Sequence, residues 1–341
     1  MKEACQPSAA TSPPAPIDWP RFVDLVRSGR QFLLTTHLRP DCDALGSTLA
    51  MAAIVEQLGK AASIVAAFDV PPRFQFLDPD KKIQRLGRDA AKDRLPPFDV
   101  LMVLDTSAWA QLGEMGDVIR STSARKLVLD HHISADDLGA EVFRDTRAEA
   151  TGRLVYEAAR HLGAALTPRI ATLLFVALAT DTGWFRFAST TAATYRLAGQ
   201  LTEAGAVPDA LYRDLYENDS VGRLQLIGRA MARVQTDLNG RLIYTWITLD
   251  DFAACGALPS DSEDVINLTL AVGGTEAAVI LVEQAAGGFK ISFRSRCGLD
   301  CARLAEQFGG GGHRAAAGAF LPDPLPLARS KVLDAVRAAM Q

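Results

Sequence analysis

The chain has 341 residues, and its 36 basic and 40 acidic side chains give a formal net charge of −4. This length suits two domains of ordinary size, and 48% hydrophobic with 22% charged residues is typical of a soluble globular protein. Proteins that grip long nucleic acids usually carry a basic surplus, so the acidic balance favours a small or short substrate.

The N-terminal 16 residues are rich in Pro, Ala and Ser, which predicts a flexible tail and not a signal peptide. The longest apolar stretch, from Ile170 to Ala179, is too short to span a bilayer. The five cysteines are scattered and odd in number, so we expect no disulfide framework. Together these features predict a cytoplasmic protein without membrane contact.

Strands and helices are expected to alternate over residues 17–205. A helix begins at Trp19, after Asp18 as N-cap and with Pro20 in its first turn. The apolar patterns predict strands at 32–36, 63–66, 100–104 and 126–129, and helices at 44–58, 150–162, 168–180 and 191–204. Near-continuous apolar strands are typical of a parallel sheet buried on both faces. We therefore expect a doubly wound α/β domain. Glu149 to Gly152 are candidates to line the cleft, but a role as helix-cap and packing residues is favoured.

The pattern changes after Gly205. Residues 206–240 predict a polar, helical linker that closes at the turn signal Asn239-Gly240. Strands follow at 242–247, 277–282 and 289–293, with helices at 263–271 and 300–308. These elements predict a smaller α/β domain over residues 241–325, and a C-terminal helix over 326–341.

Polar residues follow directly on three of the predicted strands, namely His37, Asp105 and Asp130. In an open α/β sheet the carboxyl ends of neighbouring strands share one crevice, where ligands bind. We therefore expect these residues, distant in sequence, to converge.

The converging residues have the chemistry of a metal site. Three motifs add further imidazoles and carboxylates, so that the candidate ligands are His37, Asp41, Asp43, Asp105, His131 and Asp181. Imidazole with carboxylate suits Mn, Fe or Zn better than Ca or Mg, and so many donors suit two ions that share a carboxylate. Loop aspartates often only cap helices, but titratable groups stacked at a strand end are costly without a function. Two divalent ions can activate a hydroxide and clamp a phosphate, so the sequence predicts a two-metal phosphoester site.

These motifs resemble the four motifs of the DHH phosphoesterase superfamily. The residues that carry the resemblance are His37, Pro40, Asp41, Asp43, Ala44, Gly46, Ser47, Asp105, Asp130, His131, His132 and Asp181. The run from Gly309 to Gly312, followed by His313, is similar to the signature of the accessory DHHA1 domain. Within the superfamily, the length and layout most resemble the bacterial nanoRNase/pAp phosphatase group, which degrades very short oligoribonucleotides and dephosphorylates pAp.

The resemblance implies roles for the residues of the first domain. One Mn²⁺ would bind His37 and Asp41, the other Asp43, His131 and Asp181, with Asp105 as the bridge; Mg²⁺ or Co²⁺ are expected substitutes. His132 would contact the scissile phosphate and protonate the leaving oxygen. Asp130 would orient a ligand imidazole.

The second domain is expected to bind the rest of the substrate across a cleft. Glycines let backbone amides approach a phosphate, and arginine can grip phosphate with two hydrogen bonds. The candidate contacts are Arg294, Ser295, Arg296, Gly310, Gly311, Gly312 and His313. Without the resemblance, these would be interpreted as a flexible turn and a solvated strand edge.

Several alternatives stay open at the level of sequence. The same chemistry would serve a cyclic di-AMP or pApA phosphodiesterase, and a nucleotide sensor that binds without turnover is the alternative from another class. A processive single-strand DNA exonuclease fits less well, because the chain is short and acidic and has no third domain for nucleic acid. An inorganic pyrophosphatase fits less well, because such enzymes resemble this chain only in the first domain. The expected partners are short RNA and pAp as substrates, with no long nucleic acid, and the resemblance favours a homodimer.

Overall fold

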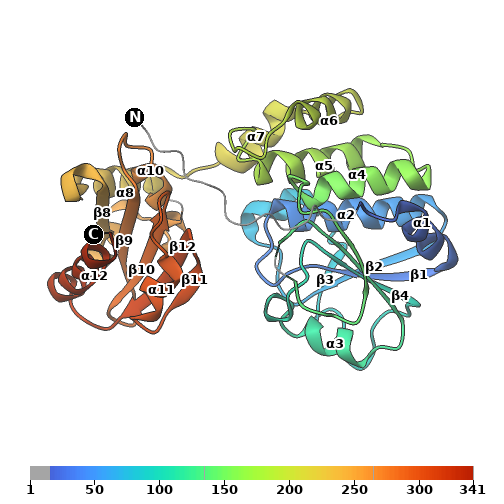
Figure 1. Ribbon diagram of the computed structural model, residues 1–341, viewed down its shortest axis with the longest axis horizontal. Coiled ribbons are helices and arrows are strands. Elements are labelled where there is room, and N and C mark those ends of the chain that lie inside the picture. Colours follow the sequence, from blue (N-terminus) through green and yellow to red (C-terminus); the bar gives the residue numbers. More distant parts are fainter. Residues whose placement is uncertain (1–15, 134, 264, 341) are drawn as a thin grey trace. The chain divides into compact units, whose positions relative to one another are not determined.

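A computed structural model describes residues 16–133, 135–263 and 265–340, with His313 described by its backbone alone. The chain divides into two compact units, Met1–Glu217 and Asn218–Gln341, and each contains one sheet with helices (Figure 1). The predicted α/β class, with a parallel sheet first and a second α/β domain after it, is confirmed. The predicted flexible tail over residues 1–16 lies outside the described residues, except for Pro16.

The sheet of the first unit has six parallel strands in the order β3-β2-β1-β4-β5-β6. Their bounds are β1 Gln31–Thr35, β2 Ala61–Ala66, β3 Ile83–Arg85, β4 Val100–Leu104, β5 Arg125–Asp130 and β6 Glu141–Arg144. Every residue of the central strand β4 is buried, as its apolar run predicts. The edge strands β3 and β6 were not predicted, because they are short and only partly apolar.

Helices cover both faces of this sheet (Figure 1). Their bounds are α1 Trp19–Ser28, α2 Cys42–Gln57, α3 Met115–Ser121, α4 Thr151–Leu162, α5 Pro168–Asp181, α6 Ala192–Glu203 and α7 Pro208–Tyr216, with short 3-10 helices η1 Pro72–Leu77 and η2 Trp109–Gln111. Helices α2, α4 and α5 pack together in one hydrophobic core, whereas α3 contributes to the core on the opposite face. Among the described residues, no helix combines the length and apolarity needed to cross a bilayer.

The order of the strands reverses direction at β1 and β4, which lie side by side although β2 and β3 come between them in sequence. Chain crossovers leave this point in opposite directions, so the carboxyl ends of β1 and β4 border a crevice. His37 follows β1 and Asp105 follows β4. The topology therefore brings the first predicted motifs to one place.

The second unit contains a mixed sheet of six strands in the order β11-β12-β10-β9-β8-β7, in which only β8 and β9 pair in parallel. Their bounds are β7 Gln235–Asp237, β8 Leu242–Ile247, β9 Ala277–Glu283, β10 Phe289–Ser295, β11 Gly311–His313 and β12 Ala316–Leu321. The helices are α8 Val221–Ala232, α9 Leu249–Cys255, α10 Val265–Thr269, α11 Cys301–Glu306 and α12 Leu325–Met340, with η3 Leu238–Gly240 and η4 Pro259–Ser262. One core contains residues of α11 and α12, and a separate core contains residues of α8, α9 and α10.

Two segments differ from the predicted organisation. Residues 206–240 do not form one linker, because Leu211 of α7 packs in the core of the first unit and Leu226 of α8 packs in the second. The C-terminal helix α12 buries Val332 and Val336 in the core of the second unit and is therefore an integral part of it. The sequence did not show that α7 and α8 belong to different units, because both helices are mostly polar and each buries only a narrow face.

The glycine run 309–312 leads into strand β11 instead of forming only a loop. A Cβ at Gly310 would lie 2.1 Å from the carbonyl oxygen of Gly318, and one at Gly312 would lie 2.6 Å from Cα of Ala317. These two glycines are therefore required by the close approach of β12. Strand β12 itself was not predicted, since its alanines and glycine give a weak strand signal.

Candidate metal centre

The six side chains predicted as ligands lie together at the carboxyl edge of the first sheet. Donor atoms within 4.8 Å of one another form the groups His37–Asp41–Asp105 and Asp43–His131–Asp181, and a further group contains Asp105, His131 and His132. The ligands were predicted to fall into two sets, one for each ion, and these two sets lie in the structure as two groups of neighbouring donor atoms. Carboxylates with imidazole form a donor set suited to Mn²⁺ or Zn²⁺. The role of these residues as ligands stays a prediction.

Asp105 lies between the two groups. Its Oδ2 is 3.4 Å from Nε2 of His37, whereas its Oδ1 is 3.6 Å from Nε2 of His131. The residue has a φ of 62°, a left-handed conformation that aspartate adopts more readily than most residues. This turn at the end of β4 leaves one carboxylate oxygen facing each group, which is the arrangement a bridging ligand requires.

The remaining donors converge from separate elements. Nε2 of His131 lies 3.8 Å from Oδ2 of Asp43 and 3.5 Å from Oδ2 of Asp181. Asp43 is in the first turn of α2, and Asp181 is the last residue of α5. The Asp41 carboxylate, 4.0 Å from Nε2 of His37, also caps α2 by accepting from the N–H of Ala44. Asp41 therefore combines the helix-cap role with the predicted ligand role.

The first turn of α4 holds two of the carboxylates in place. Backbone N–H groups of Thr151 and Gly152 donate to the two oxygens of Asp43 at 2.7 and 2.8 Å, and the hydroxyl of Thr151 donates to Asp105 at 2.9 Å. Ser47 adds a hydrogen bond of 2.9 Å to Asp43. The sequence favoured a cap and packing role for Thr151 over a place in the cleft, and no local signal in the chain points to its contacts with the carboxylates.

Three carboxylates of the cluster, Asp43, Asp105 and Asp181, bind protons more tightly than isolated aspartates do. Burial, followed by the charge of Asp105, raises the pKa of Asp43 well above 3.8; burial and the charge of Asp41 do the same for the pKa of Asp105. Burial also raises the pKa of Asp181 and lowers that of His37. Histidine charge lowers the pKa of Asp105 and Asp181 only in part, and divalent ions would neutralise the carboxylates further.

The two adjacent histidines have different surroundings. Nδ1 of His131 is 3.1 Å from the carbonyl oxygen of Ala148, which directs Nε2 towards the ligand group. Nδ1 of His132 is instead 2.8 Å from Oδ1 of Asp130. Asp130 was expected to orient a ligand imidazole; the imidazole that it contacts is that of His132, and the role of Asp130 stays a prediction. The hydrogen bond to Asp130 raises the pKa of His132 to about 9.

The predicted substrate contacts lie at one end of the second sheet. The strand register aligns Arg294 with Ala316 and Ala316 with His313, so these residues form one row across β10, β12 and β11. In the described part of the chain, neither Arg294 nor Arg296 forms an ion pair with a carboxylate. Gly311 is exposed, and a Cβ there would meet nothing within 4 Å. The contacts with substrate stay predictions.

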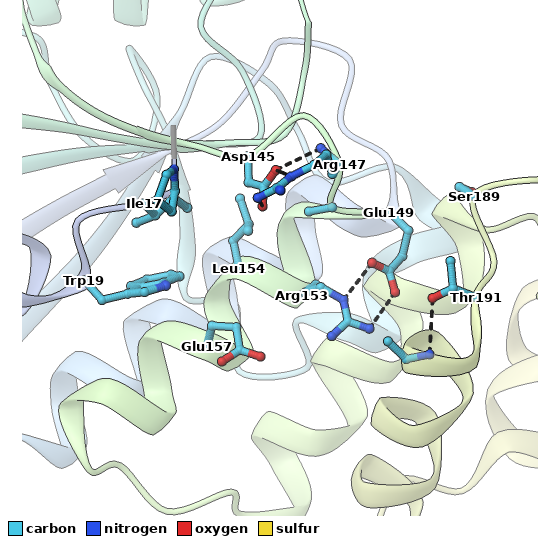
Figure 2. Close-up of a pocket in the computed structure, with 13 residues that line it drawn as sticks. Ile17, Trp19, Asp145, Arg147, Glu149, Arg153, Leu154, Glu157, Ser189 and Thr191 are labelled. Carbon is cyan, nitrogen blue, oxygen red and sulfur yellow. Dashed lines mark hydrogen bonds and ion pairs between the residues drawn. The ribbon is translucent and has the colours of Figure 1, made fainter. Parts of the chain in front are cut away.

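A cavity of about 540 Å³ lies next to the metal centre in the first unit, between the beginnings of α1, α4 and α6 (Figure 2). Its lining includes Ala148, whose carbonyl holds His131, but it includes none of the six predicted ligands. Arg147 pairs with Asp145, and Arg153 pairs with Glu149. Because both guanidinium groups already contact carboxylates, this cavity does not have the free positive charge that a phosphate site needs.

Donors of this kind at the switch point of a parallel sheet define a metal-dependent phosphoesterase as the class of protein. The family model described as "DHH family, N-terminal domain" matches residues 31–178, and that of the "DHHA1 domain" matches residues 254–341. A relative from Thermus thermophilus, named "Bifunctional oligoribonuclease and PAP phosphatase NrnA", is 33% identical over 89% of this chain and 88% of its own length. The chain belongs to the DHH family of phosphoesterases, with a DHHA1 domain as its second unit.

Other comparisons agree with this assignment. A relative of the same name from Bacillus subtilis is 27% identical over 85% of this chain and 88% of its own length. The crystal structure of an exopolyphosphatase-related protein from Bacteroides fragilis matches with a TM-score of 0.85 and 23% identity, covering 94% of this chain and 95% of that one. At this identity the structural likeness supports the fold alone.

Proposed function

We propose that this enzyme is a Mn²⁺-dependent phosphoesterase that hydrolyses short oligoribonucleotides to mononucleotides and removes the 3′-phosphate of pAp. The observation that supports the proposal most is the position of Asp105, whose two oxygens face two separate groups of donors at 3.4 and 3.6 Å. The names of the relatives from Thermus thermophilus and Bacillus subtilis supply the substrate class.

In this proposal the first unit carries the chemistry. His37, Asp41 and Asp105 would hold one ion, and Asp43, His131 and Asp181 would share Asp105 in holding the other. When bound, the pair of ions would lower the pKa of the attacking water and neutralise charge on the phosphate. With the ions supplying this chemistry, the protein side chains would position the substrate and protonate the leaving group.

The proton for the leaving oxygen comes from His132 in this proposal. Its side chain is 45% exposed, so a substrate can reach it, while Asp130 holds its Nδ1 at 2.8 Å. Imidazole is suited to proton transfer near neutral pH, and the raised pKa keeps it protonated. The second unit would bind the remainder of the substrate through Arg294, Ser295, Arg296, Gly310, Gly311, Gly312 and His313.

The proposal is tested by incubating the purified protein with Mn²⁺ and four substrates in parallel: pAp, pApA, a 24-residue RNA and cyclic di-AMP. We expect the protein to release AMP from pAp and from pApA and to leave the long RNA uncleaved. Preferred cleavage of the cyclic compound would assign the enzyme to cyclic dinucleotide turnover, and tight binding without turnover would make it a sensor.

The two-metal arrangement is tested by Asp105→Ala. Loss of a bridging ligand removes several kcal/mol of transition-state stabilisation, so we expect activity to fall by more than about 10³-fold while the fold persists. Calorimetric titration with Mn²⁺ should show fewer bound ions than in the wild type. Full activity in a folded Asp105→Ala variant would overturn the assignment.

A further inference from the structure

A buried chain of hydrogen bonds leads from Ser107 to His132. The hydroxyl of Ser107 donates a short hydrogen bond to Oδ2 of Asp130, and Oδ1 of Asp130 lies 2.8 Å from Nδ1 of His132. The backbone N–H of His132 also donates to Oδ1, at 3.2 Å. Ser107 and Asp130 are 2% and 0% exposed. Each oxygen of the carboxylate has its own donor, so the group cannot rotate without breaking both contacts.

The proton positions follow from the hydrogen bonds of Asp130. Both of its oxygens accept a hydrogen bond, Oδ2 from the hydroxyl of Ser107 and Oδ1 from the backbone N–H of His132. An ionised carboxylate only accepts hydrogen bonds, so Nδ1 of His132 carries a proton and cannot serve as a ligand atom. Among the described residues, Nε2 of His132 has no hydrogen-bond or ion-pair partner, and this nitrogen is therefore available to a substrate.

Ser107 is itself held by the loop that follows His132. Its carbonyl oxygen accepts from the N–H of Asp136 at 2.8 Å, and the Asp136 carboxylate accepts from the N–H of Trp109 at 2.8 Å. The segment after β4 and the segment after β5 are thus joined at Ser107 and at Trp109. The backbone that carries the serine hydroxyl is held in the absence of substrate, which favours its use in orienting another group.

We propose that Ser107 is a positioning residue for protonation of the leaving group: by fixing Asp130, it keeps Nε2 of His132 directed at the departing oxygen. This inference rests on the proposed function. As the oxygen of the attacking water bonds to phosphorus, the bond from phosphorus to the ribose oxygen breaks. The proton on Nε2 passes to that ribose oxygen, and solvent returns a proton to the imidazole.

The test compares two esters that differ in their leaving group. In pApA the leaving group is a ribose oxygen, which needs a proton, whereas p-nitrophenolate departs from the p-nitrophenyl ester of TMP without one. For Ser107→Ala we expect kcat on pApA to fall by about 10–100-fold, the range seen when a supporting hydrogen bond is removed. The rate on the nitrophenyl ester and the Mn²⁺ affinity, measured by calorimetry, should stay close to the wild-type values.

Thr106→Val is the matched control, because the buried hydroxyl of Thr106 bonds Gln111 at 2.9 Å and does not contact Asp130. We expect this change to affect both esters by the same factor. Ser107→Cys, similar in size with a weaker donor, should lie between alanine and the wild type, and replaces Ser107→Ala if that variant does not fold.

Equal losses on both esters, or weaker Mn²⁺ binding, would refute the role of Ser107 while leaving the proposed function intact. A wild-type protein that cleaves neither ester would refute the proposed function itself.

Discussion

The metal centre in the first unit and the arginine–glycine end of the second unit differ in how firmly their polar groups are held. Asp43 and Asp105 are each 1% exposed, and each accepts hydrogen bonds from the protein. Arg294 and Arg296 are more exposed, and Nη1 of Arg294 contacts only a neighbouring carbonyl oxygen, at 3.2 Å. Within the described residues, the carboxylates of the first region are held by hydrogen bonds, whereas the two arginines of the second have no carboxylate partner.

This difference agrees with the chemistry proposed for each region. Groups that stabilise a transition state work best when they are already in place, since reorganising them during the reaction raises the barrier. Groups that hold the remainder of a substrate tolerate motion, because their hydrogen bonds form on binding. We therefore expect substitutions in the first region to lower kcat and those in the second to raise KM.

Among substitutions that leave the predicted ligands and the proposed proton donor in place, we expect a large effect for Thr151→Val, which removes the hydroxyl that donates to Asp105 at 2.9 Å but keeps the shape of the side chain. Loss of such a contact typically lowers metal affinity or activity by about 10–100-fold. Mn²⁺ titration calorimetry and kcat on pApA measure both quantities. Thr151→Ser keeps the hydroxyl and should resemble the wild type, so equal losses in the two variants would contradict the role of this contact.

A smaller effect is expected for Gly311→Ala in the second unit. Because a Cβ there meets nothing within 4 Å, the fold should persist, but a phosphate could no longer approach the backbone as closely. We expect KM for pAp to rise by about tenfold, equivalent to about 1.4 kcal/mol, with little change in kcat. Gly228→Ala, where a Cβ also meets nothing within 4 Å, is the control. Unchanged KM in Gly311→Ala would argue against a phosphate contact at this glycine.

The smallest effect concerns pH. The pKa values of Asp43 and Asp105 are raised in the folded, metal-free protein, so their protons stabilise the fold fully below the unfolded value of 3.8. That contribution is lost as the pH rises through the raised values, when the buried carboxyls must ionise. We expect the gain in Tm on adding Mn²⁺ to be larger at pH 7.5 than at pH 5.5, by about 2–4 °C for each kcal/mol. A gain in Tm that does not depend on pH would contradict the coupling between proton release and metal binding. Asp43→Asn, which removes one of the titrating carboxyls, should weaken the pH dependence of this gain.

The sequence predicted the strands β1, β4 and β5 and the convergence of the residues that follow them, because apolar runs and parallel-sheet topology are local and general properties. It did not predict the contacts of Thr151 and Ser107. Their partners, Asp105 and Asp130, lie 46 and 23 residues away in the sequence. A buried hydroxyl also leaves no periodic signal. Strand β12 was missed for a different reason, since its small residues are explained only by the close approach of β11.

The close packing of α2, α4 and α5 makes the positions of the predicted metal ligands depend on the hydrophobic core. A Cβ at Gly46 would lie 2.5 Å from the carbonyl oxygen of Leu173, and one at Gly152 would lie 2.6 Å from Cβ of Ala177. These glycines bring together the helices that carry Asp43, Thr151 and Asp181. Over evolutionary time, a methyl group gained at either position would push apart donors that it never touches. The proposed chemistry therefore depends on core positions with no polar atom in their side chains.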